Sequence, residues 1–219
     1  MKYAGLFFTL AVLMAWLAVR GGPATWVLFY PAFSFAIVSI AYFRNDARLF
    51  GKRCDGGRTW WGYLLLGPYL AYVSIVWRLV TAVSTEAAYN RLGDDIYLSR
   101  RLLSHELPDD VASVVDLTCE FCEPTRTWSI DHYRCVPMLD GSAASVAIMM
   151  DLANEIAGMP KPVLIHCAQG HGRTGLVAAA VELHSGRAET VAEAIANVRA
   201  VRPGIGLHPP QQRVLEQIV

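Results

Sequence analysis

A short segment of the chain, H-C-A-Q-G-H-G-R-T-G at positions 166–175, carries residue types that suit chemistry on an anion. Glycine tolerates backbone angles that other residues avoid, so Gly170 and Gly172 let the chain curl tightly. A curled loop that opens a helix turns several backbone N–H groups toward one point, at the positive end of the helix dipole. The segment therefore predicts a cradle for a tetrahedral dianion.

Cys167 and Arg173 supply the two side chains that phosphoryl transfer would use in such a cradle. Amide N–H groups and a helix N-terminus stabilise the thiolate, which is the nucleophilic form of cysteine. The planar guanidinium of Arg173 can hold two phosphate oxygens at once, which lysine cannot do. A cysteine at the end of a strand is by itself more often a core residue, so the interpretation depends on the whole pattern. Further phosphate contacts are expected from the loop backbone, at Ala168, Gln169, Gly170, His171 and Gly172.

A carboxylic acid is expected near the cradle to handle the leaving-group proton. Asp140 lies in the stretch V-P-M-L-D-G-S at 136–142, between an expected strand and an expected helix. A loop there could bring the carboxyl over the cradle. It would protonate the leaving oxygen and then deprotonate the water that hydrolyses a cysteinyl-phosphate. Asp131 is the alternative acid.

These segments resemble the protein tyrosine phosphatase superfamily, whose signature is Cys-x5-Arg followed by Ser or Thr. His166, Cys167, Gly170, Arg173 and Thr174 match that signature. D-I-Y-L-S at 95–99 and V-V-D-L-T at 114–118 are similar to core strands of the dual-specificity phosphatases, and 136–142 is similar to the segment with their general acid. The resemblance covers residues 95–219 and implies a cysteinyl-phosphate intermediate, with no metal or other cofactor.

The resemblance also assigns roles to residues around the cradle. Thr174 would donate a hydrogen bond to the sulfur and help it leave in the second step. Gln211 or Gln212 would position the attacking water. His171 is interpreted as a polar residue at the rim.

The elements that must position these residues follow from hydrophobic patterning. Short apolar runs predict strands at 96–98, 112–117, 132–137 and 162–166. Longer stretches with cap and stop residues predict helices at 142–157, at 174–184, from Thr190 to before Pro203, and from Pro209 onward. Strands alternating with helices favour an α/β fold, with a central sheet flanked by helices, for a catalytic domain at 85–219.

Three uncharged apolar runs precede this domain, at about 3–19, 24–43 and 60–80. A helix needs about 17–25 apolar residues to cross a bilayer, so residues 1–84 are predicted to form an all-α membrane region of two to three transmembrane helices. The alternatives are buried core helices and, for the first run, a cleaved signal peptide. No small-residue cleavage site follows Val19, which favours multi-pass anchoring.

Charge divides at the same boundary. Residues 1–84 contain 8 Lys+Arg and 2 Asp+Glu, whereas residues 85–219 contain 11 and 17. An acidic domain argues against nucleic acid as a partner and leaves the lipid bilayer as the expected one.

The basic loop at 44–58 is expected in the cytoplasm. If the third run spans the membrane fully, the catalytic domain lies on the opposite side. If Gly67-Pro68 breaks the run, the domain stays in the cytoplasm. We favour the cytoplasmic arrangement because a reactive thiolate suits reducing conditions. The Arg- and Ala-rich composition is typical of a GC-rich bacterial genome, so the membrane is expected to be a bacterial inner membrane.

The cysteines form an odd and sparse set rather than a disulfide framework: Cys54, Cys119, Cys122, Cys135 and Cys167. A reversible disulfide between Cys119 and Cys167 is a hypothesis. Glu120 could brace Arg173, with a solvated surface glutamate as the alternative.

The substrate is expected to be a phosphomonoester. The short domain predicts a shallow pocket, and Ala168, Gln169 and His171 offer no fixed cation for a polyphosphoinositide. Membrane tethering favours a phospholipid or, nearly equally, a phosphoprotein substrate. Two other classes stay open, a rhodanese-like sulfurtransferase and a catalytically inactive phosphate-binding membrane module.

Overall fold

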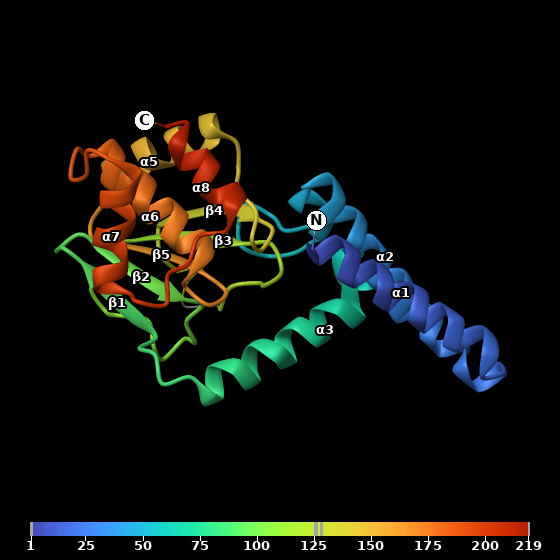
Figure 1. Cartoon of the computed structure of the whole chain (residues 1–219). Coiled ribbons are helices and arrows are strands. Elements are labelled where there is room, and N and C mark those ends of the chain that lie inside the picture. The colour runs from blue at the N-terminus through green and yellow to red at the C-terminus, as the bar shows by residue number, and fades with distance from the viewer. Residues whose placement is uncertain (1, 125–126, 128, 219) are drawn as a thin grey trace. The chain divides into compact units, whose positions relative to one another are not determined.

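The computed structural model describes residues 2–124, 127 and 129–218, and Figure 1 shows the course of the chain. Two compact units divide it. The first holds most of the chain up to Ser84 together with Cys119–Cys122, and the second holds Cys54–Gly56, Thr85–Thr118 and the chain from Glu123 onward.

The first unit is helical and apolar. Its elements are α1 (Lys2–Arg20), η1 (Pro23–Leu28), α2 (Phe29–Arg44), η2 (Ala47–Phe50) and α3 (Trp60–Val83). Three spans, Lys2–Arg20, Pro23–Arg44 and Trp60–Val83, are long and apolar enough to cross a membrane. Their large apolar side chains are widely exposed, for example Phe8 at 61% and Trp60 at 76%, which suits lipid rather than water.

Helix α3 continues through Gly67-Pro68, so the break considered above does not occur. Proline lacks an N–H group, which removes the donor that Leu64 O would receive in an α-helix. The hydroxyl of Tyr30 on α2 donates to Leu64 O at 2.6 Å instead. A Cβ at position 67 would lie 2.6 Å from that hydroxyl, so the glycine makes room for it. The Gly-Pro pair therefore serves as a docking point for α2.

The second unit is built on a five-stranded sheet in the order β1-β2-β5-β3-β4. Its strands are β1 (Tyr89–Leu92), β2 (Ile96–Arg100), β3 (Ser113–Thr118), β4 (His132–Met138) and β5 (Val163–Cys167). Only β1, which the hydrophobic pattern did not predict, is antiparallel to its neighbour. The central strands β3 and β5 are buried along their whole length, as expected for a parallel sheet with both faces covered.

The helices of this unit are α5 (Val146–Gly158), α6 (Gly172–His184), α7 (Val191–Val201) and α8 (Pro209–Glu216), and Figure 1 shows them beside the sheet. Alternate residues of β3 and β5, such as Val115 and Ile165, share one core cluster with all four helices. Val114 and Leu164 point to the other face and pack with Leu102 and Leu107. The expected α/β fold is thus confirmed. Because β2, β3, β4 and β5 are parallel, their carboxyl ends meet at one edge, which carries the candidate site.

Candidate active site

Cys167 is the last residue of β5, and α6 begins five residues later at Gly172, two residues earlier than the sequence predicted. The intervening turn, residues 168–172, is called the cradle loop below. Gly170 has a φ of +74°, and a Cβ there would lie 2.6 Å from backbone atoms of Ser99 and Arg100 on β2. Both its conformation and its close approach to β2 therefore require glycine at this position.

Three consecutive carbonyl groups of the cradle loop point away from its centre. Ala168 O accepts from Arg101 N at 3.2 Å. Gln169 O and Gly170 O accept from the guanidinium of Arg202 at 3.2 and 2.9 Å. In a trans peptide the N–H group points opposite to the C=O group, so the N–H groups that follow these carbonyls face inward. One of them, Gly170 N–H, donates to Cys167 Sγ at 3.3 Å.

Arg173 closes the cradle from the side of β3 and β4. Its side chain is 1% exposed, and Nη1 donates to Met138 O at 2.9 Å and to Leu117 O at 3.4 Å. These carbonyls lie at the carboxyl ends of the two strands. The arginine is therefore held by the sheet itself, which fixes where its guanidinium can meet a phosphate.

Asp140 lies beside Arg173, with its Oδ1 3.5 Å from Arg173 Nη2. Its side chain is 51% exposed and sits on the turn between β4 and α5, where Ser142 N–H donates to Leu139 O at 3.2 Å. Asp131 precedes β4 and so lies at the opposite end of that strand. Of the two candidate acids, the structure brings only Asp140 to the cradle.

Two residues expected to assist the chemistry, Thr174 and Gln211, are buried beside the cradle loop. The hydroxyl of Thr174, which is fully buried, donates to Ser99 O at 3.5 Å. Its hydrogen bond to the sulfur in the second step stays a prediction. Gln211, also fully buried, donates to Ser142 O at 3.0 Å, and its amide would lie 3.3 Å from a Cβ at Gly172. Gln212 donates to Leu207 O instead. Gln211 is therefore the glutamine that lies against the cradle loop.

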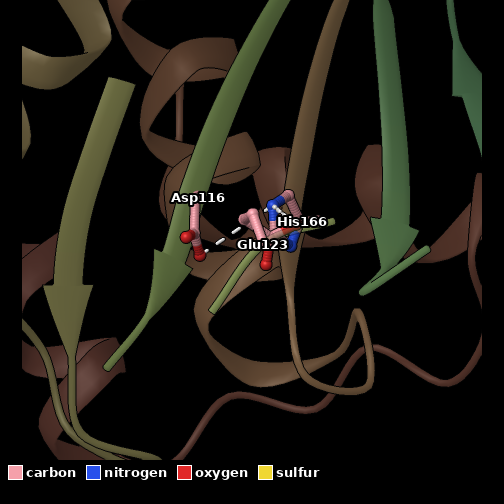
Figure 2. A group of neighbouring side chains, drawn as sticks. All are labelled: Asp116, Glu123 and His166. Carbon is pink, nitrogen blue, oxygen red and sulfur yellow. Dashed lines mark ion pairs between the residues drawn. The ribbon is translucent and has the colours of Figure 1, made fainter. Parts of the chain in front are cut away.

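A buried group of titratable side chains, which no sequence pattern predicts, lies near the carboxyl ends of β3 and β5. Figure 2 shows Asp116 from β3, Glu123 and His166 from β5 pointing toward one another. His166 Nε2 lies 3.8 Å from Asp116 Oδ1 and 3.6 Å from Glu123 Oε2, and all three side chains are at most 2% exposed. The donor set could hold a cation. Arg101 Nε lies 3.4 Å from Glu123 Oε1 and offsets part of the negative charge of the group.

Hydrogen bonds fix Asp116, one of the two acidic members of this group. Asp116 accepts from Thr118 Oγ1 and from Tyr133 Oη, both at 2.7 Å. Burial raises the pKa of Tyr133, and the neighbouring charge of Asp116 raises it further. The signal in the sequence was an aspartate inside a strand that is otherwise apolar.

The cysteines are all free thiols. Glu120 Oε2 accepts from Cys119 N–H at 3.0 Å. The disulfide between Cys119 and Cys167 and the bracing of Arg173 by Glu120 stay predictions.

Known proteins resemble the second unit. Residues 103–187 match the family described as "Polymorphic toxin system, DSP-PTPase phosphatase". A curated relative, phosphatidylglycerophosphate phosphatase PTPMT2 of Arabidopsis thaliana, is 32% identical over 76 residues, which cover 35% of this chain. The chain thus spans about a third of the length of that relative.

Among solved structures, the active form of Tk-PTP is 28% identical with a TM-score of 0.54, covering 60% of this chain and 95% of that one. PTPMT1 in complex with PI(5)P, at 18% identity and a TM-score of 0.51 over 60% of this chain and 94% of that one, shares the fold. The family match spans Asp140, Cys167 and Arg173. The C-terminal part of this chain is therefore similar to the dual-specificity phosphatases in the matched residues and in its fold.

Proposed function

We propose that this chain is a membrane-anchored, cysteine-dependent phosphomonoesterase. The thiolate of Cys167 attacks phosphorus, and the P–O bond to the leaving group breaks as the S–P bond forms. Asp140 gives its proton to the leaving oxygen. In the second step Asp140 takes a proton from water, which attacks phosphorus, releases inorganic phosphate and restores the thiolate.

One observation supports the proposal most strongly. The N–H groups of the cradle loop face Cys167 Sγ, and one of them, Gly170 N–H, donates to it at 3.3 Å. The same donors that stabilise the thiolate would bind the equatorial phosphate oxygens, where negative charge gathers in the transition state. The guanidinium of Arg173, fixed by Met138 O at 2.9 Å, would complete the ring of donors.

Asp140 favours this function over the two alternatives. A sulfurtransferase needs no acid, and an inactive binding module would not need an acid, a nucleophile and an arginine in one place. The carboxyl lies 3.5 Å from Arg173 on a half-exposed turn, from which it can reach a bound phosphoester.

A lipid phosphomonoester in the bilayer is the substrate class that the chain favours. Three spans are apolar enough to hold the chain in a membrane, and tethering raises the effective concentration of a bilayer substrate. The PTPMT2 relative is named for a phospholipid substrate, which supports the same class. A reactive thiolate suits a reducing compartment, so we propose that the catalytic domain is cytoplasmic. Because α3 is unbroken, this side requires either that the basic loop at 44–58 lies on the opposite side of the membrane or that α3 does not cross the bilayer.

Hydrolysis of p-nitrophenyl phosphate by the full-length protein in detergent tests the reaction. Cys167→Ser should be inactive, and Asp140→Asn should be slower by about 10²–10⁴-fold. Asp131→Asn is the matched control and should keep the parental rate. No turnover by the parent, or full activity of Cys167→Ser, would reject the proposal.

The substrate class needs a second assay, in which phosphate release from phospholipid monoesters in mixed micelles is compared with release from phosphopeptides. A higher kcat/KM for the lipids is expected. A preference for phosphopeptides would move the assignment to a membrane-proximal protein phosphatase. Protease accessibility of the domain in oriented vesicles tests the proposed side of the membrane.

A further inference from the structure

We infer that Arg202 is a positioning residue for the cradle, and that the segment following the last apolar helix is its second attachment point. The inference rests on the proposed function, since it concerns how the same cradle is held in shape. Arg202 follows the end of α7 and is 1% exposed, although it bears a charge. It lies outside the cradle loop and so acts through the backbone rather than on the substrate.

The guanidinium holds the outer side of the cradle loop. Its Nε donates to Gly170 O at 2.9 Å and its Nη2 to Gln169 O at 3.2 Å. Two successive peptide units are thereby locked with their oxygens outward, which leaves the N–H groups of Gly170 and His171 inward. Glycine allows many backbone conformations, so the hydrogen bonds from Arg202 select one orientation for the peptide units on either side of Gly170.

The other donors of Arg202 bind the chain just after α3. Nη1 donates to Ala87 O at 3.0 Å and to Asn90 Oδ1 at 2.7 Å. Nη2 also lies 3.4 Å from Glu86 Oε2. Helix α3 ends at Val83, so this attachment begins three residues beyond an apolar helix that is long enough to span a membrane.

A second contact joins the same segment to the cradle loop. Glu86 Oε2 lies 2.6 Å from His171 Nε2, within hydrogen-bond distance. Residue 86 therefore meets both the cradle loop and its clamp. The segment that leaves the last apolar helix is in this way part of the catalytic architecture rather than a passive tether.

The geometry requires arginine at this position. Burial lowers the pKa of Arg202, while the nearby charge of Glu86 opposes that change. A guanidinium carries five N–H donors in a fixed fork, enough to serve the cradle loop and the segment 86–90 at once. A lysine ammonium is a single point charge and cannot span acceptors on both sides.

The test compares Arg202→Lys and Arg202→Met with Arg199→Lys in the full-length protein in detergent. Arg199 lies in the last turn of α7, three residues before Arg202, and its Nε donates to Ile205 O at 2.9 Å rather than to the cradle loop. We measure kcat and KM on p-nitrophenyl phosphate, the rate at which iodoacetamide alkylates Cys167 at pH 6.5, and protection of Cys167 by inorganic phosphate. Thermal unfolding reports whether each variant is folded.

Loss of inward donors predicts that kcat of Arg202→Met falls by about 10²-fold, the lower end of the loss for removing one oxyanion donor. Alkylation and phosphate protection should weaken in parallel, with Arg202→Lys between Met and the parent. Arg199→Lys should match the parent. A folded Arg202→Lys and a folded Arg202→Met with parental kcat, alkylation and phosphate protection would overturn the inference.

Asn90→Leu tests the attachment to the segment after α3, because it removes one acceptor with little change in volume. Slower alkylation of Cys167 and a lower kcat support the attachment, whereas parental values of both contradict it. Alkylation of Cys167 and its protection by phosphate need no turnover, so they test the role of Arg202 separately from the reaction. If the parent protein binds phosphate but hydrolyses no phosphoester, the proposed function is rejected while the inference on Arg202 can still be tested.

Discussion

Replacing Gly170 by alanine separates the two reasons for a glycine in the cradle loop. Its φ of +74° strains any residue with a Cβ, and the new Cβ would lie 2.6 Å from Ser99 C, Ser99 O and Arg100 N. These are backbone atoms of a buried strand and cannot rotate away. Gly186 provides the matched control, because its φ is +69° but a Cβ there would meet nothing within 4 Å.

The magnitudes follow from these two contributions. The left-handed conformation costs a residue with a Cβ about 1–2 kcal/mol, and this applies to both positions. Overpacking against rigid neighbours costs about 1–3 kcal/mol more, and this applies only to Gly170. Gly170→Ala should therefore lower the free energy of unfolding by about 2–5 kcal/mol and Gly186→Ala by about 1–2 kcal/mol.

Activity should differ more sharply than stability. Relief of the clash moves the cradle loop away from β2 and draws Gly170 N–H off Cys167 Sγ, and one lost donor lowers kcat by about 10²–10³-fold. Denaturant unfolding and p-nitrophenyl phosphate turnover of both variants provide the measurements. Equal destabilisation of the two variants, or a Gly170→Ala protein with parental kcat, would refute the reasoning.

Three further predictions concern other parts of the chain. Tyr30→Phe removes the hydroxyl that donates to Leu64 O, so the thermal midpoint in detergent should fall by the equivalent of about 1–3 kcal/mol; an unchanged midpoint would contradict the docking role of Gly67-Pro68. Tyr133→Phe takes a donor from buried Asp116 and should cost about 1–3 kcal/mol in chemical unfolding, whereas a neutral result would show that Asp116 does not depend on that hydroxyl. Burial raises the pKa of Glu106, but hydrogen bonds from Arg100 at 2.6 Å and from Leu103 N–H at 2.8 Å outweigh it and set the pKa below its ordinary value. Glu106→Gln should thus lower the free energy of unfolding above the unfolded-state pKa of about 4.3. The difference in this free energy between variant and parent should vanish as pH falls through the folded-state pKa. An equal difference at pH 7 and pH 3 in denaturant unfolding would contradict this.

The central motif could be predicted because its chemistry is local in sequence. Cys167, Arg173 and the intervening glycines lie within one turn between a strand and a helix, and the parallel topology that brings Asp140 to the same edge follows from alternating strands and helices. The α/β fold was predicted for the same reason.

The supports of the cradle could not be predicted because they depend on contacts between distant parts of the chain. Arg202 and Ala87 are 115 residues apart, and no periodic pattern links them. The edge strand β1, with only four residues, carries too little hydrophobic signal to stand out. Gly67-Pro68 is typical of a helix break, but the hydroxyl of Tyr30, 34 residues from Leu64, supplies the donor that the proline lacks.

The buried group of Asp116, Glu123 and His166 could not be predicted either. Asp116, Glu123 and His166 come from different segments, and each alone is an ordinary polar residue in the sequence. The pairing of β3 with β5 brings Asp116 within 3.8 Å of the imidazole, and the segment after β3 brings Glu123 within 3.6 Å of it.

Rapid-quench trapping of the covalent intermediate tests the account most directly. The full-length Asp140→Asn protein, mixed with a phosphomonoester whose leaving group needs no acid and quenched within its first turnover, should carry phosphate on the sulfur of Cys167 as read by peptide mass spectrometry. Phosphate on another residue, or turnover with no phosphocysteine at any quench time, would contradict it.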